Sequence, residues 1–273
     1  ISISRASSSF THRLRYSVAG QSGTIATGVG TSYRWTVPTS LINGLTNTKS
    51  AKCTIYCDTY SGSTNIGTKS TTLTLTIPTS SASLSASSVN YGSSVTININ
   101  RAHSKLTHRL RYNWNGNTGT IATSVGTSHS WTVPNSFMNY IPNATSTTGT
   151  IYVDTYNGSA LVGSISLSLK TVVPSSVVPS FSSISHSEKN SAVAALSLGS
   201  GIYVQNLSQI QITINSPQGA YGSTIKSYKI EVDGKSYTTR TATTNTITGK
   251  GTLKIKATIT DSRGRSEEHT SEL

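Results

Sequence analysis

The sequence predicts an all-β protein made of tandem immunoglobulin-like and fibronectin-like antiparallel β-sandwiches. Three observations predict this class. The chain of 273 residues is rich in serine, threonine and β-branched residues and only 11% charged, a composition that favours pleated, half-buried strands. Apolar and polar residues alternate in short runs, whereas few windows show the period of an amphipathic helix. Turn signals recur about every 8–12 residues, as they do in β-sandwich domains.

An internal repeat predicts the first two domains. The hexapeptide THRLRY occurs at 11–16 and again at 107–112, 96 positions later, and the flanking segments repeat at the same offset without a gap. A gap-free repeat of this length indicates two copies of one folding unit. We assign residues 1–78 to the first copy, which we expect to be truncated at its N-terminus, and residues 79–174 to the second copy.

The elements of one copy follow from its local pattern. In the second copy, alternating apolar and polar residues predict strands over 94–99, 108–115, 150–159 and 166–170. The dipeptide Asn157-Gly158 is typical of a tight hairpin turn. The segment 134–143, which lies between two prolines, is the one place where we expect a helical turn.

A third sandwich is predicted over residues 175–264, which do not repeat the first two copies. A Pro/Ser-rich linker precedes it, and Asp233-Gly234 lies between two alternating runs, as in a hairpin. Residues 252–260 alternate again and predict a further strand. The last residues, 265–273, read RSEEHTSEL and resemble the translation of a sequencing adapter. We therefore leave them out of the fold prediction as an adapter-like, non-native tail.

The repeated strand suggests a polar surface. Arg13 and Arg15 lie on one face of their predicted strand, and Tyr56 and Asp58 lie on the outward face of another. If the two strands are neighbours, their exposed side chains suit stacking against sugars or binding another protein. The simpler interpretation, which we favour, is a solvated face with a cross-strand Arg–Asp pair of roughly 0.2–1 kcal/mol. The candidate binding residues in the two copies are Arg13, Arg15, Tyr56, Arg109, Arg111 and Tyr152.

The opposite face of the same strands predicts the core. We expect His12 and His108 to be structural histidines at the edge of the core. Cys53 and Cys57 lie roughly 13 Å apart on one strand face, too far for a disulfide, so we expect buried free thiols. The residues expected to be buried are Leu14, Trp35, Ile55, Leu110, Trp131 and Ile151, and the four arginines of the candidate site are expected to be largely exposed.

The residue inventory argues against catalysis. Asp58 and Asp154 are equivalent positions in separate copies, and neither copy offers a second carboxylate to face them, as glycoside hydrolysis requires. No nucleophile motif or metal-ligand spacing occurs either, so we expect neither an enzyme nor a cofactor. The net charge of +13 is spread along the chain without a basic run, so we expect no nucleic-acid partner. No apolar stretch is long enough for membrane insertion.

Four segments together resemble a known family. They are 22–38, 154–159, 220–234 and 257–265, and they are similar to minor structural proteins of siphoviruses, a family catalogued as a domain of unknown function and associated with the tail tip or fibres. The resemblance implies a non-enzymatic module located in the virion tail, with other phage tail proteins as partners. From the diffuse positive charge we add an anionic cell-wall glycopolymer of the host as a partner. The alternative is an extracellular bacterial surface adhesin built of similar modules.

Overall fold

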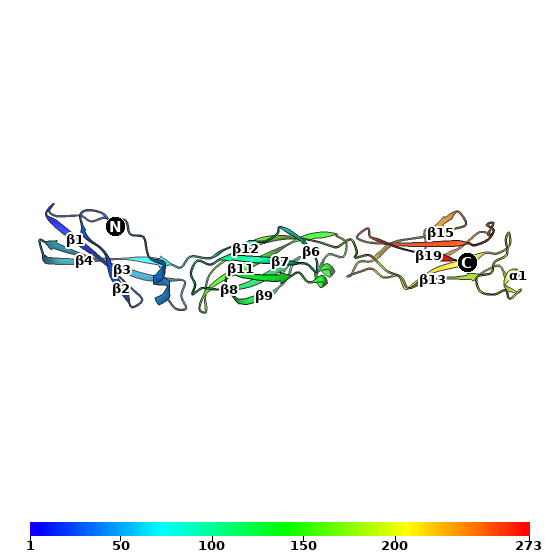
Figure 1. Cartoon of the computed structure of the whole chain (residues 1–273), viewed down its shortest axis with the longest axis horizontal. Helices are drawn as coiled ribbons and strands as arrows, with labels where there is room; N and C mark the ends of the chain where they lie inside the picture. The colour runs from blue at the N-terminus through cyan, green and yellow to red at the C-terminus, as the bar shows by residue number, and fades with distance from the viewer.

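The computed structural model describes residues 1–273 and arranges them as three β-rich domains in one extended row (Figure 1). Domain 1 is residues 1–78, domain 2 is residues 79–174 and domain 3 is residues 175–273. Antiparallel pairing dominates all five sheets, and each domain has its own cluster of buried apolar residues. The predicted all-β class with antiparallel sandwiches is confirmed.

Domain 1 contains four strands: β1 (Phe10–Val18), β2 (Gln21–Val29), β3 (Ser50–Ser61) and β4 (Thr64–Thr76). They form one antiparallel sheet in the order β2-β1-β3-β4. A 3-10 helix, η1 (Thr39–Gly44), connects β2 to β3 and buries Leu41 and Ile42 against the sheet. The N-terminal segment makes only a single bridge, Ser2 to Ser32, beside this sheet.

Domain 2 is a two-layered sandwich. Its strands are β5 (Ser81–Leu84), β6 (Ser88–Asn90), β7 (Ser94–Asn100), β8 (Thr107–Trp114), β9 (Asn117–Val125), β10 (Ser128–Thr132), β11 (Ser146–Asn157) and β12 (Ala160–Val172). One sheet has the order β6-β12-β11-β8-β9 and the other the order β10-β7-β5. A core of fifteen buried residues lies between them. The expected helical turn is present as the 3-10 helix η2 (Asn135–Tyr140).

The two repeat copies share one strand order and one register. In domain 1, His12 lies opposite Thr59, and in domain 2, His108 lies opposite Thr155. The bulges between β1 and β2 recur at the same positions between β8 and β9. The prediction that the copies match strand for strand is confirmed for four strands, because the gap-free offset leaves no inserted residue to shift their pairing. It is wrong for β10, whose equivalent in domain 1, residues 32–36, forms only the bridge from Ser32 to Ser2.

Most of the predicted core is buried, with two exceptions. Leu14, Leu110, Ile55 and Ile151 are at most 3% exposed. The two tryptophans, Trp35 and Trp131, were expected to be buried and are only half-buried. Trp131 lies on the edge strand β10, where no neighbouring strand covers one side, and Trp35 lies outside any strand. Each stacks on a tyrosine instead, Tyr16 in domain 1 and Tyr112 in domain 2.

The cysteines are both free, as their spacing on one strand predicts. Cys53 is buried in the core of domain 1. Cys57 was also expected to be buried, and it is half-buried because the inner face of β3 is less completely covered at that position. Burial raises the pKa of both thiols, so neither is an activated nucleophile.

Domain 3 contains the elements β13 (Ser183–Glu188), α1 (Ser191–Ala194), β14 (Ile210–Asn215), β15 (Ile225–Val232), β16 (Lys235–Tyr237), β17 (Thr241–Thr243), β18 (Lys254–Asp261) and β19 (Ser266–Glu272). They form a three-stranded sheet, β13-β14-β17, and a four-stranded sheet, β16-β15-β18-β19, which enclose eleven buried residues. The hairpin predicted at Asp233-Gly234 joins β15 to β16, and both turn residues have positive φ.

The last nine residues belong to the fold of domain 3. Residues 265–273 were left out of the fold prediction as an adapter-like tail, yet they contain β19, which pairs along its whole length with β18. Its alternating exposed and half-buried side chains suit the outer edge of a sheet, where a polar strand is tolerated. The exclusion of these residues from the fold was therefore wrong.

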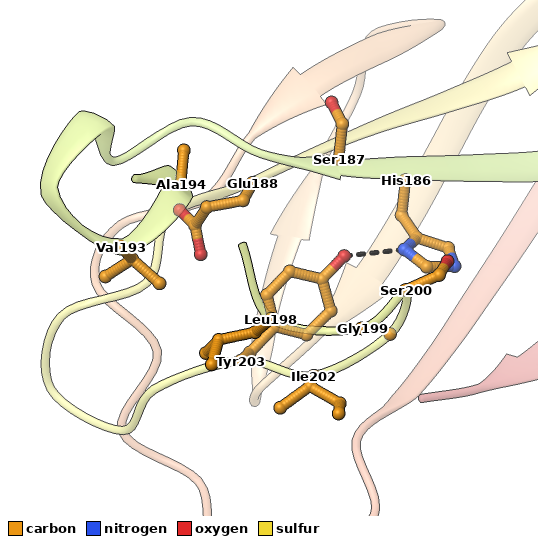
Figure 2. Close-up of a pocket in the computed structure, with 11 residues that line it drawn as sticks. His186, Ser187, Glu188, Val193, Ala194, Leu198, Gly199, Ser200, Ile202 and Tyr203 are labelled. Atoms are coloured by element: carbon orange, nitrogen blue, oxygen red, sulfur yellow. Dashed lines mark hydrogen bonds between the residues drawn. The ribbon is translucent and has the colours of Figure 1, made fainter. Parts of the chain in front are cut away.

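One pocket of about 220 Å³ opens beside α1 at the end of domain 3 that points away from domain 2 (Figures 1 and 2). No group of three or more His, Cys, Asp and Glu side chains is arranged to hold a metal ion. No helix is long and apolar enough to cross a bilayer.

Candidate functional site

The repeated THRLRY segment lies on β1 in domain 1 and on β8 in domain 2. In the β1–β3 register, Arg13 lies opposite Asp58 and Arg15 lies opposite Tyr56. Because side chains alternate along a strand, all four project from the outer face of the sheet. We call Arg13, Arg15, Tyr56, Asp58 and Tyr60 the domain 1 ladder.

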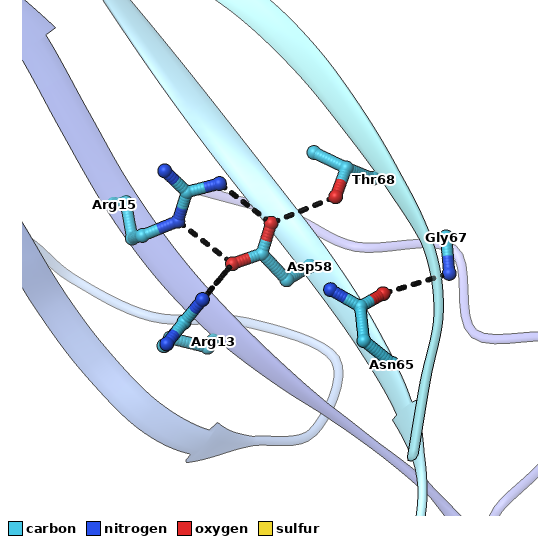
Figure 3. A network of polar contacts seen from close by, with 6 residues as sticks. All are labelled: Arg13, Arg15, Asp58, Asn65, Gly67 and Thr68. Carbon is cyan, nitrogen blue, oxygen red and sulfur yellow. Dashed lines mark hydrogen bonds and ion pairs between the residues drawn. The ribbon is translucent and has the colours of Figure 1, made fainter.

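The Asp58 carboxylate is the centre of this ladder and is completely buried. Arg15 donates from Nε and Nη2 to its two oxygens at 2.7 and 2.8 Å, a bidentate pair (Figure 3). Arg13 donates from Nε at 3.0 Å, and the hydroxyl of Thr68 donates at 2.8 Å. Two guanidinium groups and one hydroxyl therefore enclose the carboxylate, which has no free side to act as a general base or metal ligand.

Domain 2 builds the same arrangement, the domain 2 ladder, from Arg109, Arg111, Tyr152, Asp154 and Tyr156. Arg111 donates to both oxygens of Asp154 at 2.6 and 2.8 Å. Arg109 donates from Nε and Nη2 at 3.1 Å, and the hydroxyl of Ser164 donates at 2.8 Å. Ser164 is the equivalent of Thr68, so the hydroxyl donor is kept although the residue type differs.

Hydrogen bonding keeps both aspartates ionised. The bond from Arg15, the largest influence, holds the pKa of Asp58 well below its usual range although burial acts to raise it. The bond from Arg111 likewise lowers the pKa of Asp154 to about 2. The same bonds raise the pKa of Arg15 and Arg111. With two arginines and one aspartate, each ladder carries a net positive charge.

Each arginine of the two ladders also lies over a tyrosine ring. Such cation–π contacts contribute about 0.5–1 kcal/mol each at exposed sites. The four pairs are Arg13–Tyr60, Arg15–Tyr56, Arg109–Tyr156 and Arg111–Tyr152, with guanidinium-to-ring distances of 5.8, 5.0, 5.5 and 4.9 Å. Each guanidinium is held between a carboxylate and a ring, which fixes its plane.

The structure brings the six candidate residues together as two groups of three, with differences from the sequence-based expectation. Asp58 and Asp154 were expected to face outward into solvent, and they are buried because two arginines and a hydroxyl enclose each one. The arginines were expected to be largely exposed, but their side chains are only 36–41% exposed because they lie flat against the carboxylate and the rings. One Arg–Asp pair was expected in each copy, but two arginines form ion pairs with each aspartate.

The two histidines of THRLRY have a structural role, as expected. His108 is 1% exposed, and its Nδ1 lies 3.0 Å from the carbonyl oxygen of Val125. Its Nε2 lies 2.9 Å from the hydroxyl of Ser80, which also accepts from the backbone of Ala102. His12 is 3% exposed and lies close to backbone carbonyls in the same way.

The residues that join domain 1 to domain 2 were missed by sequence reasoning. Lys105, between β7 and β8, donates from Nζ to the carbonyl oxygens of Asn43, at 3.0 Å, and of Leu45. The buried amide of Asn157 also donates to Leu45, at 3.1 Å. Leu106 is fully buried, and it packs into the core of domain 1 although it belongs to domain 2.

The sequence does carry a signal for this junction, because the junction residues differ between the two repeat copies. The equivalents of Lys105 and Asn157 in the first copy are Ser9 and Ser61. Asn157 was predicted to be a turn residue, but it pairs with Ala160, so the turn itself is the two residues between them. Its side chain is used at the junction instead.

Domain 3 joins domain 2 by a similar device. Arg263, in the turn between β18 and β19, is 7% exposed. Its guanidinium donates to the carbonyl oxygens of Met138 at 2.9 Å and Ile141 at 3.3 Å, at the end of η2. Ile141 is the equivalent of Leu45. At both junctions, therefore, a cationic side chain of the following domain binds carbonyl oxygens at the end of the preceding 3-10 helix. The oxygen of Met138 is shared, because it also accepts the backbone N–H of Ile141.

Comparison with solved structures finds tandem β-domains. A tetra-tandem repeat from the extending region of a large adhesion protein covers 98% of this chain and 67% of its own, with 11% identity and a TM-score of 0.43. Fibronectin(III)-like modules of Clostridium thermocellum CbhA cover 70% of this chain and 92% of their own, with 10% identity and a TM-score of 0.26. At these TM-scores the likeness carries no argument about function.

Comparison with protein families is more specific. No curated protein matches the chain. A family model described as "Siphovirus protein of unknown function (DUF859)" matches residues 1–82 and again residues 76–272. The two matches meet near Pro78, where the first repeat copy ends. Together they cover almost the whole chain, which therefore belongs to this siphovirus family.

Proposed function

We propose that the chain is a non-enzymatic structural segment of the siphovirus tail, at the tip or in a fibre. Membership of a siphovirus family supports a virion-associated or extracellular location. The observation that carries the proposal is the end-to-end arrangement of three domains whose junctions are buried and hydrogen-bonded. A rod of this kind suits a part that holds other tail proteins at a fixed distance.

The junctions support a mechanical role because their contacts resist bending. Leu106 of domain 2 lies inside the core of domain 1, so a hinge motion there would expose apolar surface to water. Arg263 makes hydrogen bonds on both sides of the second junction, to Met138 in domain 2 and to Tyr221 in domain 3. Linkers without such contacts leave neighbouring domains free to move.

The ladders support the absence of catalysis in this proposal. The only carboxylates of the repeated faces, Asp58 and Asp154, are buried and bound by arginine, so they cannot accept a proton from a substrate at neutral pH. A general base needs a pKa near the working pH and an open approach for the substrate. Both conditions fail here.

The test of the tail assignment is labelling of intact particles. Antibodies raised against the purified chain are applied to phage particles and located by gold labelling in electron microscopy. We expect gold at the distal tail, and none on particles treated with pre-immune serum. Labelling on the capsid, or a complete lack of labelling on particles that contain the protein by mass spectrometry of opened virions, would overturn the tail assignment.

The second role that we propose concerns the two ladders, which would attach the chain to an anionic cell-wall glycopolymer of the host. It is favoured by the net positive charge of each ladder and by the partial exposure of its arginines and tyrosines. Each ladder offers little binding energy alone, since exposed charge pairs contribute about 0–1 kcal/mol. Several copies on one tail would multiply weak affinities.

The attachment role is tested by binding of the labelled chain to host cells across a salt series. Replacing the arginines would leave a buried aspartate without its partner, so the sharper variants are Tyr56→Ser and Tyr152→Ser together. We expect the double variant to bind several-fold less and the wild type to lose binding as salt rises. Tyr33→Ser, at an exposed tyrosine outside the ladders, is the control. Binding indifferent to salt and to the double variant would leave the ladders as structural features only.

A further inference from the structure

The free end of domain 3 is apolar. Ten large hydrophobic side chains are exposed in the whole chain, and four of them lie within twelve residues, between α1 and β14. A concentration of exposed apolar side chains of this kind marks an interaction site in soluble proteins. The four are Leu196, Leu198, Ile202 and Leu207, which are 42–60% exposed.

Glu188 lines the pocket at the same end and has one carboxylate oxygen without a hydrogen-bond partner. Oε1 of Glu188 accepts three backbone N–H groups, from Lys189, Asn190 and Gln209. Oε2 is buried and makes no hydrogen bond. Burial acts to raise the pKa of Glu188, but Ser208 and the backbone donors outweigh it, so the pKa is lowered and the group is ionised.

The walls of the pocket suit a cation. Glu188 supplies the charge, and the ring of Tyr203 forms one side (Figure 2). Tyr203 is held in place by its hydroxyl, which lies 2.6 Å from Nδ1 of His186. Val193, which is buried, and Ile202, which is exposed, supply apolar surface to its lining. An aromatic face beside a carboxylate favours an ammonium or guanidinium group with an alkyl stem and disfavours an anion.

In domains 1 and 2, the end that faces the following domain already binds a basic side chain of that domain. Domain 2 places the cationic Lys105 beside the buried Leu106 on domain 1, and domain 3 places Arg263 on the end of domain 2. Domain 3 has a free acceptor and exposed apolar side chains at the corresponding end, the one that points along the row away from domain 2 (Figure 1).

We infer that the free end of domain 3 docks a further β-sandwich domain, which inserts a basic side chain beside Glu188 and packs an apolar turn residue against Leu198 and Ile202. The feature that identifies such a partner is a turn that carries both a basic and an apolar side chain. The inference stands apart from the proposed tail location, because it concerns only what the end of domain 3 binds.

The test uses the full chain and a cyclic peptide that carries residues 101–107 of domain 2, the turn that docks on domain 1. We expect the peptide to bind the wild-type chain by isothermal titration or NMR, with signals shifted around Glu188 and Ile202. Glu188→Gln, which keeps the shape and the Oε1 acceptor, is expected to weaken binding about tenfold or more, because a charge-assisted hydrogen bond is lost. A peptide with Lys105 replaced by Ala is expected to weaken it by a similar factor.

Two further variants test the apolar contact and control for the loss of a carboxylate elsewhere. Ile202→Ser changes a side chain that is 58% exposed, so folding is preserved while the apolar contact is lost, and binding is expected to fall several-fold. Glu231→Gln, at a partly exposed carboxylate elsewhere on domain 3, is the matched control and is expected to bind like the wild type. A lack of peptide binding at millimolar concentration, or binding that ignores Glu188→Gln, would overturn the inference. Concentration-dependent self-association of the chain that Glu188→Gln abolishes would also overturn it, since the occupant would then be a second copy.

Discussion

Trp114 stands directly over Gly149 in the core of domain 2, where a Cβ atom on the glycine would lie 2.2 Å from the indole ring. In domain 1 the equivalent residues are Val18 and Cys53, a smaller side chain opposite a larger one. The two copies therefore fill equivalent space in their cores differently, one with a large and a very small residue and the other with two residues of intermediate size.

We predict that Gly149→Cys destabilises the protein by about 1–3 kcal/mol, because the core has no room for the new side chain beside Trp114. The double variant Trp114→Val, Gly149→Cys, which copies domain 1, is expected to lose less stability than the sum of its two single changes. Urea unfolding of the three variants measures this coupling. Additive losses would show that the two residues do not share one space.

Asp58→Asn is predicted to destabilise the protein by about 2 kcal/mol. The substitution leaves Arg13 and Arg15 facing each other without a negative charge, a cost reduced by their partial exposure to water. Asp154→Asn is expected to act alike in domain 2. Glu231→Gln, which breaks an exposed pair with Lys229, is the control and is expected to change stability by less than about 0.5 kcal/mol. Equal losses for the buried and the exposed pair would contradict this ranking.

The ladders also predict how stability depends on acid. The folded pKa of Asp154, about 2, lies below the ordinary value of 3.8. A carboxyl whose pKa is depressed by folding stabilises the folded state above its unfolded pKa and loses that effect as the pH falls through its folded pKa. We expect the urea midpoint to fall between about pH 4 and pH 2, and Asp154→Asn to flatten part of this fall. A variant with an unchanged pH profile would show that Asp154 contributes nothing to it.

Leu106→Ala is predicted to loosen domain 1, although the residue belongs to domain 2. Its side chain is fully buried among the apolar residues of domain 1, so truncation leaves a cavity that costs about 2–5 kcal/mol. Hydrogen exchange is expected to increase in β1 and β3. Leu110→Ala, at an equally buried leucine in the core of domain 2, is expected to act on β8 and β11 instead. Faster exchange confined to domain 2 in the first variant would contradict the shared core.

Arg263→Gln is predicted to free domain 3 from domain 2. The shorter side chain loses the bonds to Met138 and Ile141 that cross the junction. Distances between spin labels on domains 2 and 3, measured by pulsed EPR, are expected to spread over a wider range than in the wild type. Arg263→Lys, which keeps the charge and part of the reach, is expected to give an intermediate width. An unchanged distribution in Arg263→Gln would show that other contacts hold the junction.

Much of the fold was predictable because its signals are local. Alternation along β8 predicted which face carries Leu110 and which carries Arg109, and the gap-free repeat predicted a common register for both copies. Neither signal depends on knowing which strands are neighbours. The same alternation placed the six candidate residues on one outer face in each copy.

The errors arose where a second element decides the environment. Asp58 faces outward on its strand as predicted, but it is buried because side chains from both neighbouring strands enclose it. Trp131 faces inward, but its strand lies at an edge. Arg263 and Asn157 act across domain boundaries, and no pattern within one domain reveals such a contact.

The acceptors at both junctions are backbone carbonyl oxygens, which every residue type provides. The receiving end of a domain can therefore change its side chains during evolution without losing its neighbour, provided that the short helix keeps its shape. The donor is the side chain on which these hydrogen bonds depend, and it is a lysine at one junction and an arginine at the other. Phages that exchange or duplicate such domains would change the length of the rod in whole-domain steps, with a basic residue of the added domain at each new boundary.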